Sequence, residues 1–153
     1  MLAIKIKSEL VDAARYARRA ALRARLGSAP HGLVLMYHRL ASPAADPWGI
    51  CVSRENFAAH LEVLKRYGPC LKFADLARAL QGPAPPKHAI AVTFDDGYRD
   101  NLVTGLPLLA AAGIPATVFV ASGATGSARE FWWDTLTRIF LLTPVSPQTL
   151  HLQ

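Results

Sequence analysis

Three short apolar runs along the chain predict buried β-strands. The runs occupy residues 32–38, 89–94 and 116–120. Runs of this length are typical of strands that lie inside a parallel sheet, where both faces are covered. We expect the first run to be buried on both faces, because its apolar residues are continuous and do not alternate with polar ones.

Between these runs the apolar residues follow the helical period. After Ser53, a residue type that caps helix N-termini, Phe57, Leu61 and Leu64 fall on one helical face, and Gly68 ends the segment. Three further helices are predicted, at residues 73–80, 98–112 and 131–142. Strands therefore alternate with helices, which predicts an α/β fold with a parallel sheet.

The composition excludes a disordered chain and fits one domain. The chain has 153 residues, of which 52% are hydrophobic, and this is enough apolar mass to form a core. Its two cysteines, Cys51 and Cys70, lie far apart in the sequence and form no CxxC pair. Reduced thiols are the expected state, and the sequence does not exclude a disulfide between the two cysteines.

The positive charge is concentrated in a leader segment. The net charge is +6, but seven basic and only two acidic residues fall within residues 1–26. This leader is rich in alanine, lacks Pro and Gly, and precedes Gly27, so it predicts a helix. We therefore divide the chain into a basic N-terminal helix, residues 1–27, and a domain, residues 28–153. The nearly neutral domain gives no reason to expect a nucleic-acid partner.

The leader does not have the features of a membrane segment. Its apolar face is mostly alanine, so we favour a helix packed on the domain over contact of residues 1–26 with a membrane surface. It contains no continuous apolar core of a signal peptide. The most apolar stretch, residues 106–121, is interrupted by Pro107, Gly113 and Pro115, so no transmembrane segment is expected. The sequence does not decide between a cytoplasmic protein and one associated with the cell envelope.

Two of the predicted strands end in polar clusters. Tyr37 is followed by His38 and Arg39, and the second strand is followed by Asp95 and Asp96. Functional groups of parallel α/β folds gather where strands end. Adjacent carboxylates repel each other, so a metal cation bound by one, with the other as base, would explain the pair. A solvated Asp-Gly turn explains it equally well from spacing alone.

The longer string around these carboxylates resembles a known family. Residues 93–101 (TFDDGYRDN), residues 113–120 (GIPATVFV) and residues 35–39 (LMYHR) closely resemble the polysaccharide deacetylases, which share the NodB homology domain and belong to the carbohydrate esterases of family 4 type. The resemblance runs from about Leu33 to Val120. It implies a distorted (β/α) barrel and a metal-dependent hydrolase, usually a zinc enzyme, that removes acetyl groups from N-acetylated polysaccharides or oligosaccharides.

The same resemblance implies roles for individual residues. Asp95 corresponds to the catalytic base and Asp96 to a metal ligand, with the base taking a proton from a metal-bound water. His38 is expected to line the active site, although a histidine that satisfies a buried carbonyl fits its position as well. Tyr98 directly follows the Asp95-Asp96-Gly97 string and is also assigned to the active-site lining. We favour a role in fixing this turn over contact with substrate.

Other aromatic residues have two interpretations. Trp132 and Trp133 are of a type that stacks on sugar rings, but paired aromatics at the start of a helix are more often part of a core. Asn101, on the first turn of the helix after the motif, is expected to pack or to fix the turn. We therefore assign none of the three to substrate binding from the sequence.

The chain departs from the family pattern after the third predicted strand. The family has a later H-[ST]-x-x-H motif with two metal ligands, whereas the only histidine after Gly97 is His151. A barrel of this kind has seven or eight strands and roughly 200 residues or more. We therefore predict the N-terminal part of a deacetylase domain, with an incomplete zinc site and no activity of its own. A non-catalytic remnant that binds carbohydrate or a partner is the alternative, and an adaptor that acts through the basic leader is a third.

Overall fold

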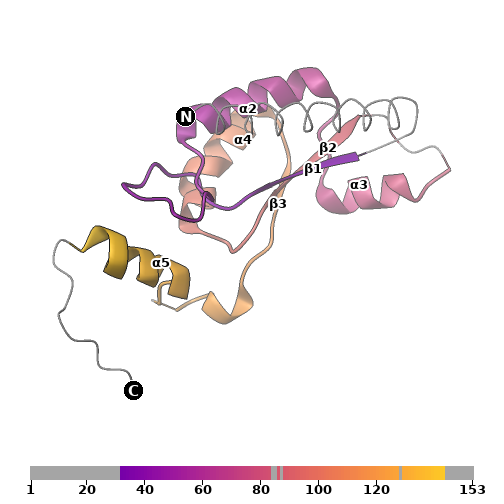
Figure 1. Cartoon of the computed structure of the whole chain (residues 1–153). Coiled ribbons are helices and arrows are strands. Elements are labelled where there is room, and N and C mark those ends of the chain that lie inside the picture. Colours follow the sequence, from indigo (N-terminus) through magenta and orange to yellow (C-terminus); the bar gives the residue numbers. More distant parts are fainter. Residues whose placement is uncertain (1–31, 84–85, 87, 128, 144–153) are drawn as a thin grey trace, which may run out of the picture.

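A three-stranded parallel sheet lies at the centre of the computed structural model, which describes residues 32–83, 86, 88–127 and 129–143 (Figure 1). The strands are β1 (Gly32–Tyr37), β2 (Ala89–Phe94) and β3 (Ala116–Val118), in the order β1-β2-β3. Both neighbouring pairs are parallel. The α/β class with a parallel sheet is thereby confirmed.

The register brings the ends of the strands together. Tyr37 pairs with Phe94, and Phe94 pairs with Val118, so the three strands end at one level of the sheet. The residues that follow them therefore emerge at the same edge. In parallel α/β folds this carboxyl edge is where ligands bind.

Helices connect the strands as the sequence predicts. α2 (Arg54–Tyr67) begins after Ser53, whose Oγ accepts a hydrogen bond from the backbone N of Asn56 over 3.1 Å. α3 (Phe73–Leu80) has the predicted bounds. Gly113, with a φ of 66°, ends α4 (Leu106–Ala112), which a π-helical turn precedes. That π-helical turn is Asn101–Gly105. After β3 comes a short 3-10 helix, Ser122–Ala124. The last helix, α5 (Trp132–Thr137), continues into a second π-helical turn, Arg138–Leu142.

Helices cover the two faces of β2. Figure 1 shows α2 and α4 together on one side of the sheet and α3 on the other. Phe57 of α2 and Leu109 of α4 belong to the main core with the side chains of Ile90, Val92 and Phe94. The alternate residues of β2, Ala89 and Ala91, pack against Leu76 of α3. β2 is therefore buried throughout, as its continuous apolar run indicates.

The first strand is less buried than its sequence indicates. Leu33, Val34 and Met36 are 39%, 45% and 62% exposed, so the expectation of burial on both faces is wrong for β1. β1 is an edge strand of the described sheet, and α3 contacts it mainly near Gly32, where a Cβ would lie 2.9 Å from Leu76 Cδ1. Val34 and Met36 occupy the same face as Ala91 and Thr93 of β2 and lack the cover that α3 gives to Ala91.

Four other expectations concern the cysteines, the N-terminal helix, the barrel and a transmembrane segment. Cys51 and Cys70 are free thiols, each partly buried, and burial is the main cause that raises the pKa of both. The basic N-terminal helix lies outside the described residues, and three described strands do not make a closed barrel, so both stay predictions. Within the described part of the chain, no helix is long and apolar enough to span a bilayer.

Candidate active site

The turn after β2 places its two carboxylates in different backbone conformations. The backbone N of Asp95 donates to the Tyr37 carbonyl over 2.9 Å, which continues the β1–β2 pairing by one residue. Asp96 is in the left-handed region, with a φ of 68°. This conformation costs a non-glycine residue about 1–2 kcal/mol, although Asp tolerates it better than most. Residues held in this way concentrate at functional sites.

Glycine fits the next position, residue 97, with less strain than any other residue type. Its φ is 75°, and a Cβ built there would lie 3.0 Å from Val120 Cγ1. The segment after β3 approaches so closely because the backbone N of Ala121 donates to the Asp96 carbonyl over 3.3 Å. The Asp-Asp-Gly string is therefore a tight turn that is held against the chain after β3.

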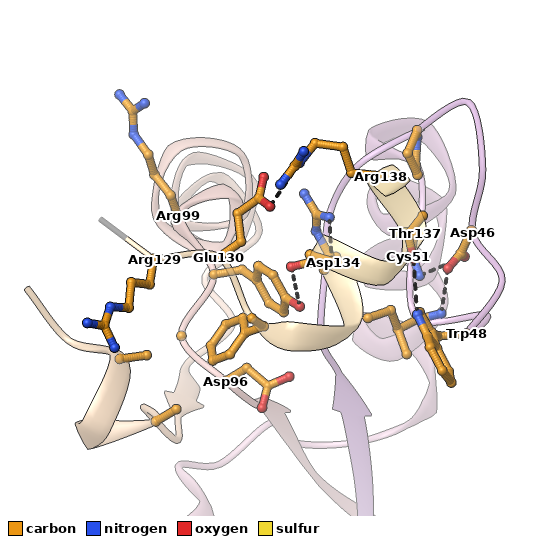
Figure 2. Close-up of a pocket in the computed structure, with 18 of the residues that line it drawn as sticks. Asp46, Trp48, Cys51, Asp96, Arg99, Arg129, Glu130, Asp134, Thr137 and Arg138 are labelled. Atoms are coloured by element: carbon orange, nitrogen blue, oxygen red, sulfur yellow. Dashed lines mark hydrogen bonds and ion pairs between the residues drawn. The ribbon is translucent and has the colours of Figure 1, made fainter. Parts of the chain in front are cut away.

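Asp96 lies where three cavities meet. The first, of about 550 Å³, also contains Tyr98 and Arg39 in its wall, and Figure 2 shows Asp96 beside this space. The second, also about 550 Å³, lies on the open face of the sheet and contains Asp95. The third, of about 320 Å³, contains His38. Asp96 therefore shares a cavity with each of the other predicted site residues, whereas Asp95 lines only the second of these three.

Tyr98 connects the turn to α5. Its hydroxyl donates to Asp134 Oδ2 over 3.0 Å and accepts from Trp133 Nε1 over 2.6 Å. Burial raises the pKa of Tyr98 strongly; the hydrogen bond from Trp133 opposes this and the hydrogen bond to Asp134 adds to it. The phenol therefore stays protonated at neutral pH and acts as a fixed donor. This agrees with the favoured role of fixing the turn.

Arg39 lies against the same tyrosine. Its guanidinium carbon is 4.7 Å from the centre of the Tyr98 ring, and its NH1 is 3.7 Å from Asp134 Oδ1. Its Nε donates to Asp100 Oδ2 over 3.2 Å, while Asp100 Oδ1 accepts from the backbone N of Leu40 over 3.0 Å. Burial lowers the pKa of Arg39, but the hydrogen bond and charge of Asp100 outweigh this and raise it above its ordinary value.

These contacts include residues to which the sequence reasoning gave no role. Arg39 and Asp100 lie inside the strings that carry the family resemblance, so the resemblance could have indicated a role for both. Asp134 follows Trp133 directly. Trp48 lies in the loop after β1, and no motif or periodicity in the sequence indicates a role for it. Asn101 is buried as expected of a packing residue, and its side-chain amide has no hydrogen-bond partner within the described structure.

The two neighbouring tryptophans differ in burial. Trp133 is partly buried and stacks on Phe131 at 4.6 Å between ring centres. Trp132 is 63% exposed, so the expectation of a core position is wrong for it. α5 meets the rest of the fold through the side of the helix that carries Trp133 and Asp134, and this leaves the ring of Trp132 toward solvent.

The described residues do not complete a metal centre. Nowhere in the described ranges do three His, Cys, Asp or Glu side chains lie close enough together to hold a metal ion. His151, the only histidine after the motif, lies outside these ranges. A catalytic zinc ordinarily has three protein ligands and a water. The donor set of the described residues is therefore too small for such an ion.

Comparison with known proteins is consistent with the sequence motif. Residues 82–141 match the family model of the polysaccharide deacetylases. YxkH of Bacillus subtilis (strain 168), whose name describes it as a polysaccharide deacetylase, is 32% identical over 95 residues, which cover 61% of this chain and 33% of YxkH. The chain thus spans about a third of the length of this curated relative.

Two solved structures resemble the fold. IcaB from Ammonifex degensii is 30% identical, with a TM-score of 0.57, over 65% of this chain and 42% of IcaB. The Streptococcus pyogenes deacetylase PplD, solved in complex with acetate, is 27% identical, with a TM-score of 0.54, over 69% of this chain and 50% of PplD. Both similarities cover half or less of the solved chain.

Proposed function

We propose that this chain is part of a polysaccharide deacetylase, the family whose model matches residues 82–141, and that it supplies part of the active site of a hydrolase that removes N-acetyl groups from amino-sugar polysaccharides. The observation that carries the proposal is the Asp95-Asp96-Gly97 turn. It lies at the carboxyl edge of the sheet, keeps a non-glycine residue in the left-handed region, and opens on three cavities.

The two carboxylates have separate roles in this proposal. Asp95 follows Thr93 on the open face of the sheet and shares the cavity there, so it is assigned as the base that accepts a proton from the attacking water. Asp96 is assigned as one ligand of a divalent cation, with zinc as the expected metal. Its strained backbone is consistent with a position that is fixed for ligation and not for packing.

The substrate class follows from the family and from one neighbour. PplD was solved with acetate, which is the acid that hydrolysis of an acetamide releases. We propose an N-acetylated polysaccharide or oligosaccharide as the substrate of the complete domain. Because the described residues supply too few metal ligands, we propose that the 153-residue chain alone does not turn over substrate.

A non-catalytic remnant that binds carbohydrate is the second candidate. The lack of a cluster of three metal-binding side chains among the described residues favours it, because Asp95 and Asp96 would then be only a turn. Reading the coding DNA past residue 153 separates the two. An H-[ST]-x-x-H motif, in frame or frameshifted, supports the enzyme, and a true stop without that motif supports the remnant.

The direct test is a calorimetric titration of the chain with Zn²⁺, combined with a deacetylase assay on an N-acetylglucosamine oligomer. We expect weak zinc binding that the Asp96→Asn variant abolishes, and no acetate release. Asn also tolerates the left-handed region, so this variant removes the charge without the backbone penalty. Asp75→Asn, at an exposed position on α3, is the control. Zinc binding that is equal in the Asp96 variant would contradict the ligand role, and robust acetate release by the isolated chain would contradict the incomplete site.

A further inference from the structure

All three tryptophans of the chain lie in the wall of one cavity. The cavity of about 320 Å³ beside Asp96 is lined by His38, Trp48, Ile50, Asp96, Trp132 and Trp133, and the whole sequence contains three tryptophans. Trp48 comes from the loop after β1, and the other two come from the start of α5. Segments distant in sequence thus contribute the same residue type to one small space next to the proposed metal ligand.

The tryptophan rings are fixed in position but remain open to solvent. Trp48 is 50% exposed and Trp132 is 63% exposed. Their rings meet edge to face at 6.1 Å between centres, and Trp132 meets Trp133 in the same way at 5.4 Å. The Nε1 of Trp48 donates to Thr137 Oγ1 over 3.2 Å. Rings held in this way lose little conformational freedom when a ligand covers them.

The chemistry of the lining disfavours an anionic ligand. Among the residues that the structure describes, the wall contains one carboxylate, Asp96, and one imidazole, His38, but no Lys or Arg side chain. An anionic ligand would therefore meet a negative charge without a counter-ion. A pyranose has C–H groups on its faces, which are attracted to the negative face of an aromatic ring, and hydroxyl groups on its edge, which can bond to the polar side chains.

We infer that this cavity is a sugar subsite, in which Trp48 and Trp132 form an aromatic wall for one uncharged pyranose ring of an N-acetylated oligosaccharide. The subsite adjoins the Asp95-Asp96-Gly97 turn through Asp96. The choice of an N-acetylated sugar rests on the proposed function. The stacking of a ring without negative charge rests on the three tryptophans and on the lack of a basic side chain among the described residues of the wall.

The test is a titration of the intact 153-residue chain with N,N′,N″,N‴-tetraacetylchitotetraose, followed by tryptophan fluorescence. Because the chain has no tryptophan outside this wall, any change in its emission originates there. We expect a saturable change. In calorimetry, Trp48→Ala and Trp132→Ala should each weaken binding by roughly tenfold, the scale of one aromatic contact. Trp132→Phe retains a ring and should lie between wild type and Trp132→Ala.

Phe140→Ala provides the matched control. Phe140 is 64% exposed, lies in the helical turn that continues α5, and is absent from the cavity wall. This variant should bind the oligosaccharide as the wild type does. The inference is overturned if the wild type shows no saturable change, or if Trp48→Ala and Trp132→Ala bind as tightly as Phe140→Ala. A protein segment that covers the tryptophans in place of a sugar would give this second result.

The subsite and the proposed function can fail separately. If Trp132→Ala loses oligosaccharide binding while zinc binding is unaffected by Asp96→Asn, the subsite stands and the metal-ligand role fails. If Asp96→Asn abolishes zinc binding while the tryptophan variants bind oligosaccharide normally, the ligand role stands and the aromatic wall fails. Titration with glucosamine tetramer, which is cationic, tests the charge of the bound ring: the N-acetylated form should bind more tightly, and equal or tighter binding of the cationic form would overturn the assignment of an uncharged ring.

Discussion

The hydroxyl of Tyr98 donates a 3.0 Å hydrogen bond to Asp134, a residue 36 positions later in the chain. Tyr98 directly follows the Asp-Asp-Gly turn, and Asp134 lies on the first turn of α5. Figure 2 shows Asp134 within the group of charged side chains above Asp96. This hydrogen bond therefore connects the carboxyl edge of the sheet to the helix that carries two of the wall tryptophans.

Removing the Tyr98 hydroxyl should destabilise the fold. Tyr98→Phe leaves Asp134 Oδ2 and Trp133 Nε1 without this partner, and an unsatisfied, partly buried group costs about 1–3 kcal/mol. We expect the free energy of unfolding, measured by urea denaturation, to fall by about that amount. Tyr67→Phe, on a tyrosine that is 50% exposed, should have little effect. Equal stability of the two variants would show that the hydroxyl contributes nothing.

The raised pKa of Tyr98 predicts loss of stability in alkaline solution. Above the ordinary pKa of about 10, an unfolded tyrosine loses its proton while native Tyr98 keeps it. The unfolded state then binds fewer protons, so the free energy of unfolding falls as the pH rises. The contribution is fully present below pH 10. Tyr98→Phe should show a shallower decline than wild type between pH 9 and 11, and parallel curves would contradict this.

The backbone of the turn should reject a side chain at position 97. Gly97→Ala adds a Cβ 3.0 Å from Val120 Cγ1 at a residue whose φ is 75°. We expect thermal unfolding to show a loss of about 1–3 kcal/mol. Gly123→Ala is the matched control, because nothing lies within 4 Å of its built Cβ. If both variants melt at the same temperature, the turn is not constrained as described.

Two Asp–Arg pairs of different burial should differ in their contribution to stability. Asp100, whose side chain is 16% exposed, bonds to Arg39 and to the backbone N of Leu40. Asp100→Asn leaves the guanidinium of Arg39 without its nearest charge, and we expect a loss of about 2–3 kcal/mol in urea unfolding. Asp75→Asn removes the exposed partner of Arg78 and should cost at most about 0.5 kcal/mol. The reverse order would contradict the role given to Asp100.

The elements that the sequence predicts best are those whose burial is decided locally. The apolar run at residues 89–94 is β2 with the expected bounds, and Ser53 caps α2 as its residue type indicates. The exposure of Met36 could not be predicted, because the same apolar run serves both a central strand and an edge strand. The third run is also shorter than expected, since β3 ends at Val118.

The same distinction holds for the site. Asp95 and Asp96 are adjacent in sequence, so the motif alone is enough to propose them as site residues. Arg39 and Asp100 lie 61 residues apart and meet only because β1 and β2 are parallel neighbours that end at one level. The exposure of Trp132 depends on the side from which α5 contacts the fold, and no local pattern determines this.

The open sheet has a consequence for handling the protein. β1 and β3 are the two edges of the described sheet, and apolar side chains of Val34, Met36, Phe119 and Val120 are each at least 45% exposed beside them. Unpaired strand edges next to apolar surface are templates for pairing with other chains. The isolated chain should therefore self-associate increasingly as its concentration rises, and dilute solutions are the condition in which the titrations above report on single molecules.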